Sequence, residues 1–139
     1  MKQYITSVQT NNRDQIDSQS SKRNILEALK YLDLVKICQI ADLDQGAQDV
    51  VLAIMLLLKE NVDMGTAKKL MMQKDFIDRL KGFKLKAVDA ATLKELKKFT
   101  IKMTFNPDWQ SQYTNGLRLL CMWVLKTQKD AIRLRKIKK

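Results

Sequence analysis

Apolar residues recur every three or four positions through much of residues 24–40, with polar residues between them. The apolar positions are Ile25, Leu26, Leu29, Leu32, Val35 and Ile40. This spacing places them on one side of an α-helix, so it predicts a first amphipathic helix. Asp42, Asp44 and Gly46 interrupt the pattern, and Asp44 is a candidate N-cap for the next element.

Residues 50–58 (VVLAIMLLL) are apolar on every side of any helix that they form. A helix of this kind is buried most of the way round, so we expect it to be the centre of the core. A strand of the same length stays an alternative on periodicity alone. Residues 48–49 and 59–60 continue the segment in helix-compatible residues, which favours the helix.

The second half of the chain predicts shorter helices joined by polar turns. One is expected around residues 66–72 and another around 75–80, where Gly82 is placed to end the second. A longer amphipathic segment follows over residues 88–101, and its lysines alternate with apolar positions at helical spacing. These elements would wrap the apolar centre at residues 50–58.

Residues 104–116 (TFNPDWQSQYTNG) contain the only proline of the chain. We expect a structured loop there, with one helical turn after Asn106 and Pro107. A final helix is predicted from about Leu117. Its first half is apolar, and its end over residues 126–139 is strongly basic.

The composition indicates one all-α domain. The chain has 139 residues with 45% hydrophobic content, which suits a single compact core. Four glycines and one proline are few for a sheet-rich fold, because tight turns and bulges use those residues. We expect a polar, extended tail over residues 1–22 and a compact bundle of about six helices over residues 23–139.

The net charge of +11 and the pI near 9.7 predict attraction to anionic partners. Charge alone leaves nucleic acid, anionic lipid and an acidic protein polymer open. The first residues contain no apolar run typical of a signal peptide, and no stretch approaches the roughly 20 apolar residues that span a bilayer. We therefore expect a soluble, intracellular protein.

Residues that carry chemistry are scarce. The chain has no His, and Cys38 and Cys121 lie singly in apolar runs, so zinc sites of paired Cys and His are excluded. Both thiols are expected to be buried in the core. Neither GxxxxGK[ST] nor GxGxxG is present, and no nucleophile stands beside a base. The sequence therefore predicts a protein that is not an enzyme and holds no cofactor or metal.

Four short motifs occur in a characteristic order. They are AKKLM at residues 67–71, KDFIDRL at 74–80, FNP at 105–107 and LCMWV at 120–124. In this order and spacing the chain resembles the stalk-tip domain of dynein heavy chains, particularly the axonemal ones. The resemblance runs from about Ala28 to Lys136, and LCMWV is its most specific motif.

The resemblance implies a helical bundle at the end of a short antiparallel helix pair, which binds the groove between tubulin subunits. In that family the binding face is made by three parts: the first tip helix, the short helix with the KDFIDRL-like motif, and the start of the returning helix. Carried over to this chain and extended to basic and aromatic neighbours, the expected tubulin-binding or partner-binding residues are Lys68, Lys69, Lys74, Arg79, Lys81, Trp109 and Arg118. Cys121 and Trp123 are expected to lie in the core.

The chain also departs from the family. Leu43 and Asp44 stand where the family has two prolines before the first tip helix, Gln48 replaces a basic residue, and Met64 replaces a tryptophan. The 139-residue sequence contains neither the dynein motor nor its ATP sites. We therefore expect a structural, microtubule-binding protein of the cytoskeleton in a cilium or axoneme, with other axonemal proteins as partners and without nucleic-acid or membrane partners.

Two alternatives stay open. The first alternative is that the chain is a fragment of a dynein heavy chain, although its initial Met and polar first residues favour a separate protein. In the second, the basic last helix binds nucleic acid, although no helix-turn-helix, zinc-finger or RNA-binding signature accompanies it.

Overall fold

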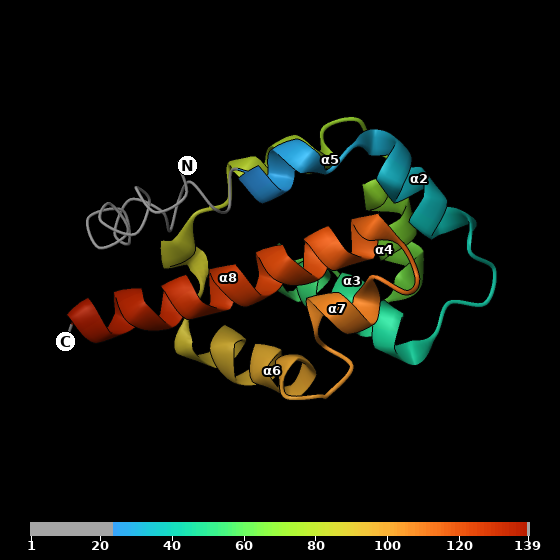
Figure 1. Ribbon diagram of the computed structural model, residues 1–139. Helices are drawn as coiled ribbons and strands as arrows, with labels where there is room; N and C mark the ends of the chain where they lie inside the picture. Colours follow the sequence, from blue (N-terminus) through green and yellow to red (C-terminus); the bar gives the residue numbers. More distant parts are fainter. Residues whose placement is uncertain (1–23, 139) are drawn as a thin grey trace, which may run out of the picture.

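The computed structural model describes residues 24–138, and the predicted tail at residues 1–22 lies outside them. The described part consists of helices and the connections between them and contains no strand, which confirms the all-α prediction (Figure 1). Residues 24–28 are helical and precede the labelled elements. These are α2 (Tyr31–Gln39), α3 (Gln45–Leu57), α4 (Met64–Met71), α5 (Phe76–Lys81), the 3-10 turn η1 (Leu85–Ala87), α6 (Ala90–Thr100), α7 (Pro107–Gln110) and α8 (Asn115–Lys138).

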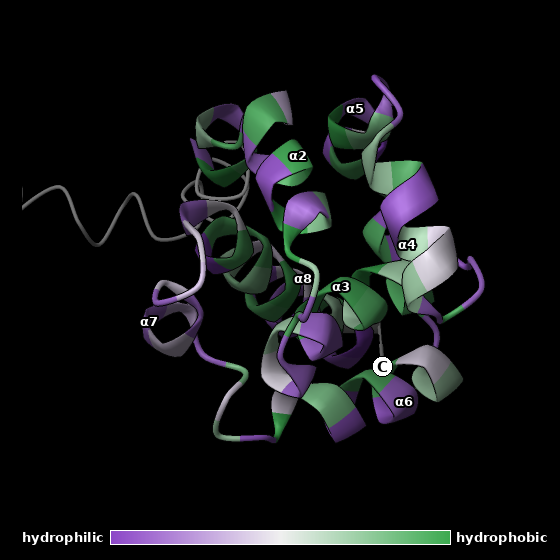
Figure 2. Ribbon diagram, turned by 90° about the vertical axis from the view of Figure 1, so that its right-hand side faces the viewer, coloured by the Kyte–Doolittle hydropathy of each residue, from purple (hydrophilic) through white to green (hydrophobic). Residues whose placement is uncertain are grey.

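Helices α3 and α8 form the centre of the bundle. Helix α3 packs against α4, α6 and α8, and α8 packs in addition against α2, α7 and η1. Most of the α3 side chains are buried. Figure 2 colours the ribbon by hydropathy and shows hydrophobic residues along α3. The buried helix predicted at residues 50–58 is therefore confirmed, and it begins earlier, at Gln45.

The first helix is not continuous as predicted, because the chain breaks it at Leu29 and Lys30. Lys30 has an extended backbone (φ −112°, ψ 156°) and is the N-cap of α2. Its N–H donates to a carboxylate oxygen of Asp33 at 2.9 Å, and its ammonium group donates to the carbonyl of Glu27 at 3.0 Å. These bonds satisfy the backbone N–H and the ammonium group of Lys30 at the break. The apolar spacing therefore belongs to two helical pieces and not to one helix.

The start of α8 lies directly against α2. A Cβ atom added at Gly116 would stand 3.0 Å from the Cβ of Asp33 and 3.2 Å from Cδ1 of Ile37. Residues 24–39 and α8 run in opposite directions in Figure 1. Glycine at this position permits the close approach of the two helices.

Side-chain caps begin several of the helices. Asp63 accepts a hydrogen bond from the N–H of Thr66 at 2.7 Å, Asp89 from Thr92 at 2.8 Å, and Asn106 from Asp108 at 2.8 Å. Each cap satisfies a backbone donor that the helix leaves unpaired. The cap at Asn106 confirms the single helical turn predicted at α7.

The LCMWV motif is part of the core. Trp123 is 1% exposed, and its ring meets Phe83 edge-on at 5.5 Å. Cys121 is fully buried, and burial raises the pKa of its thiol to about 12. Both core predictions are confirmed. The prediction for Cys38 is only partly right, because its thiol is half-buried and donates to the carbonyl of Lys68 at 3.9 Å.

Candidate partner-binding surface

Five of the seven predicted binding residues lie on one region of the fold. Lys68 and Lys69 belong to α4, Lys74 to the connection that follows, and Arg79 and Lys81 to α5. We call this region the α4–α5 surface. Lys69, Lys74 and Lys81 are exposed and form no ion pair with other described residues, whereas Lys68 and Arg79 are half-buried.

Helix α4 is held firmly against its neighbours. The Tyr31 hydroxyl on α2 donates to the carbonyl of Met72 at 3.0 Å, at the C-terminal end of α4. The cap of Asp63 holds the other end, and Ala67 and Met71 are buried toward the core. The lysines of α4 therefore project from a rigid backbone, which lowers the entropy cost of presenting them to a partner.

The charge of Arg79 is partly engaged within the molecule. Its guanidinium group donates to the Glu60 carboxylate at 3.0 Å, and the two side chains are 32% and 33% exposed. This ion pair joins α5 to the connection between α3 and α4. Asp75 and Asp78 are exposed beside it, so the α4–α5 surface is basic but mixed in charge.

Arg118 lies apart from this surface. Its guanidinium nitrogens donate to the Asn115 side chain at 3.1 Å and approach the Met122 sulfur at 3.4 Å, both on α8. Helix α2 packs against both α4 and α8, whereas no comparable packing joins α4 to α8. The structure therefore does not group Arg118 with the α4–α5 lysines.

Trp109 belongs to a third place, where α7 meets the connection between α2 and α3. Its indole N–H donates to the Tyr113 hydroxyl at 3.3 Å, and that hydroxyl donates to the Asp44 carboxylate. The hydrogen bond to Asp44 raises the pKa of Tyr113. Asp44 occupies the predicted N-cap position of α3 but makes no side-chain cap bond. Trp109 stays 45% exposed, as a partner-binding aromatic residue would be.

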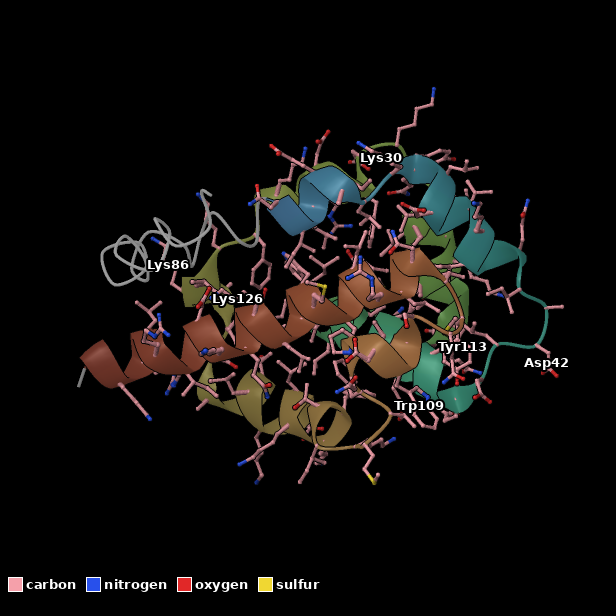
Figure 3. All side chains as sticks on the ribbon, viewed as in Figure 1. Lys30, Asp42, Lys86, Trp109, Tyr113 and Lys126 are labelled. Carbon is pink, nitrogen blue, oxygen red and sulfur yellow. The ribbon has the colours of Figure 1, made fainter. Side chains whose placement is uncertain are left out.

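A second basic region lies where η1 packs against α8. Figure 3 shows Lys86 and Lys126 on the side of the molecule away from Asp42. On α8, Lys126, Lys129, Arg133 and Lys136 follow one another at intervals of three and four. Residues at this spacing share one side of a helix. We call these four cations the α8 stripe. The sequence shows that the end of the last helix is basic, and the intervals of three and four between the cations are the signal that identifies the stripe.

The comparisons with known proteins add no family to this picture. No protein-family model matches the chain, and no curated protein matches its sequence. Over residues 24–138, no group of His, Cys, Asp and Glu side chains is placed to hold a metal ion. No helix in this range is long and apolar enough to cross a membrane.

Proposed function

We propose that the chain is a non-enzymatic, microtubule-binding structural module of the dynein stalk-tip kind. One observation carries the proposal: the motif-bearing segments lie, in sequence order, on four helices of one bundle. AKKLM lies in α4, FIDRL in α5, the asparagine-capped turn at FNP begins α7, and LCMWV lies inside α8. The resemblance implies this order of helices.

The α4–α5 surface supplies the chemistry that such binding needs. Its exposed lysines carry positive charge that no described acidic side chain neutralises, and the surface of tubulin is acidic. Charges at the rim of an interface raise the association rate and favour one class of partner. The module would therefore bind by electrostatic attraction, in the cytoskeleton of a cilium or axoneme and beside other axonemal proteins.

The test is co-sedimentation of the full chain with taxol-stabilised microtubules over a series of salt concentrations. We expect binding at low salt that weakens steeply as salt rises, because exposed charges are screened over about 8–10 Å at 0.1–0.15 M ionic strength. Nucleotide is expected to have no effect. Duplex DNA is added as a competitor, because a basic surface attracts any polyanion and nucleic acid is the second candidate partner.

Matched variants separate the surface from the overall charge. Lys69, Lys74 and Lys81 are each changed to Glu in one variant. The control changes exposed cations on α6 and α8, namely Lys94, Lys97 and Arg135, to Glu. Both variants lose the same charge and alter no ion pair that the structure records.

We expect the α4–α5 variant to bind about tenfold or more weakly, since three interfacial charge pairs become repulsive, and the control to lose far less. Equal losses in the two variants would show that net charge alone governs binding, and the proposed surface would be wrong. Failure of the wild-type chain to pellet at low salt, or complete displacement by DNA, would refute microtubule binding.

A further inference from the structure

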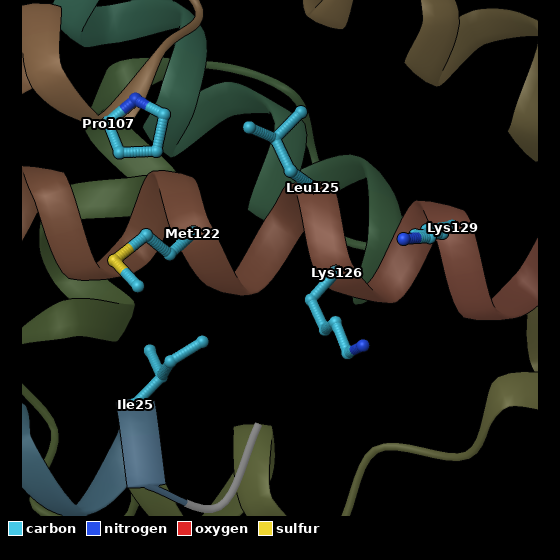
Figure 4. A pocket seen from close by; sticks show the side chains of 6 residues that line it. All are labelled: Ile25, Pro107, Met122, Leu125, Lys126 and Lys129. Atoms are coloured by element: carbon cyan, nitrogen blue, oxygen red, sulfur yellow. The ribbon is translucent and has the colours of Figure 1, made fainter. Parts of the chain in front are cut away.

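An apolar groove runs along one side of α8, between residues 24–28 and α7. It measures about 340 Å³, at the lower end of the range of about 300–1,000 Å³ for ligand pockets. Its lining is Ile25, Pro107, Met122, Leu125, Lys126 and Lys129. Figure 4 shows the two lysines at the end of the groove away from Pro107. The groove is thus apolar at one end and basic at the other.

The basic end continues beyond the groove. Lys129 is exposed, and Arg133 and Lys136 extend the same side of α8 by two further turns. Ile132 is exposed on this part of the helix as well, at 41%. Lys126 is the most buried of these cations and lies 3.9 Å from the Asp130 carboxylate. Lys129 and Lys136 therefore offer two exposed cations beside a place for one apolar side chain.

We propose that this groove and stripe bind an acidic peptide segment of a partner protein, with one apolar side chain in the groove and carboxylates along the stripe. The apolar side chain would pack between Ile25 and Met122, and the carboxylates would pair with Lys129 and Lys136. This site is separate from the α4–α5 surface and does not depend on microtubule binding.

The groove favours a peptide over nucleic acid. A nucleic-acid backbone presents phosphates but no aliphatic side chain, so it would leave the groove beside Met122 and Leu125 empty. An acidic segment with one apolar residue satisfies both halves of the site, because burial of the apolar group adds to the charge pairing. Recognition of this kind combines an apolar anchor with a charged rim.

The experiment measures binding of a synthetic peptide, in which one leucine is flanked on either side by three glutamates, to the full chain. Fluorescence anisotropy gives the Kd, and NMR of [13C-methyl]methionine-labelled protein reports on Met122. The Met122 signal is assigned with a Met122→Leu variant. We expect salt-sensitive binding that shifts the Met122 methyl signal.

Two comparisons test the two halves of the site. Lys129→Glu with Lys136→Glu is expected to raise the Kd about fivefold or more, whereas the equally charged control Lys94→Glu with Lys97→Glu on α6 changes it little. Replacing the leucine of the peptide by serine is expected to raise the Kd about fivefold, without any change in the protein. Equal effects of the two protein variants, or no effect of the serine, would overturn the proposal.

Two other occupants are outcomes of the same experiment. Residues 14–17 of this chain (DQID) have the proposed ligand chemistry. If Ile16→Ser makes the peptide bind several-fold more tightly, the chain's own segment is the occupant, and the proposal of a partner is wrong. If a DNA duplex binds the stripe and shifts Met122 in the same way, the stripe is a nucleic-acid site instead.

Discussion

Replacing Gly116 by alanine tests the close packing of α8 on α2. The new Cβ would meet the Cβ of Asp33 at 3.0 Å, Cδ1 of Ile37 at 3.2 Å and the carbonyl oxygen of Asp33 at 3.3 Å. These distances are shorter than ordinary van der Waals contacts, and one of the atoms belongs to the backbone. The neighbouring atoms of α2 must therefore give by a few tenths of an ångström to admit a single methyl group.

The expected loss of stability is about 1–2 kcal/mol. Overpacking of a core contact typically costs about 1–3 kcal/mol. Alanine recovers part of this by its better helix propensity, which is worth up to about 1 kcal/mol in a helix interior and less in the first turn. Because Gly116 is the second residue of α8, the steric term should win.

Urea unfolding followed by circular dichroism measures the difference, with Gly82→Ala as the matched control. Gly82 ends α5 at φ −90°, which any residue adopts, and its added Cβ would meet only the Asp78 carbonyl, at 3.5 Å. We expect the free energy of unfolding of that control to lie within about 0.5 kcal/mol of the wild-type value or slightly above it. A Gly116→Ala protein as stable as the Gly82→Ala control would refute the close approach of the two helices.

Two further predictions concern polar contacts. Lys102→Met should lower the free energy of unfolding by about 1–2 kcal/mol, because it removes the ammonium group 3.1 Å from the Asp49 carboxylate, which is 3% exposed. In the same urea assay, Lys98→Met removes an exposed pair with Glu95 and should change the free energy little. Equal losses in the two variants would contradict this prediction. Hydrogen bonds from Thr92 lower the pKa of Asp89, so its capping contribution is present above the unfolded pKa and is lost as the pH falls through the folded value. The difference in urea midpoint between the wild type and Asp89→Ala should therefore shrink below about pH 4, and a difference that grows there would exclude this linkage.

The parts of the fold that the sequence predicted are those in which composition is decisive. Residues 50–58 have no polar side, so any helix there must be buried, and its burial follows from the hydrophobic effect alone. In the LCMWV motif at residues 120–124, every residue except the partly buried Met122 is confirmed as core for the same reason. Asn106 before Pro107 predicted a helical turn, because both residues are suited to a helix start.

Other features depend on contacts that local patterns do not contain. The break before α2 lacks Gly and Pro, and apolar spacing continues across it through Leu29 and Leu32. The bonds from Trp109 to Tyr113 and on to Asp44 join segments about 65 residues apart in the sequence. Arg118 is on α8, which packs against α2 and not comparably against α4, and only the tertiary arrangement decides this.

The break at Lys30 has a mechanical consequence. An unbroken helix moves as a rod, so a push along its axis at one end appears at the other. Here an axial push on residues 24–28 meets an extended residue, while the Gly116 contact fastens α2 to α8. Both helical pieces are anchored, however, because Ile25 and Leu26 before the break are only 8% and 3% exposed and belong to the core. The break at Lys30 therefore joins two fixed helices, and an axial load on residues 24–28 would pass into the core before it reached α2.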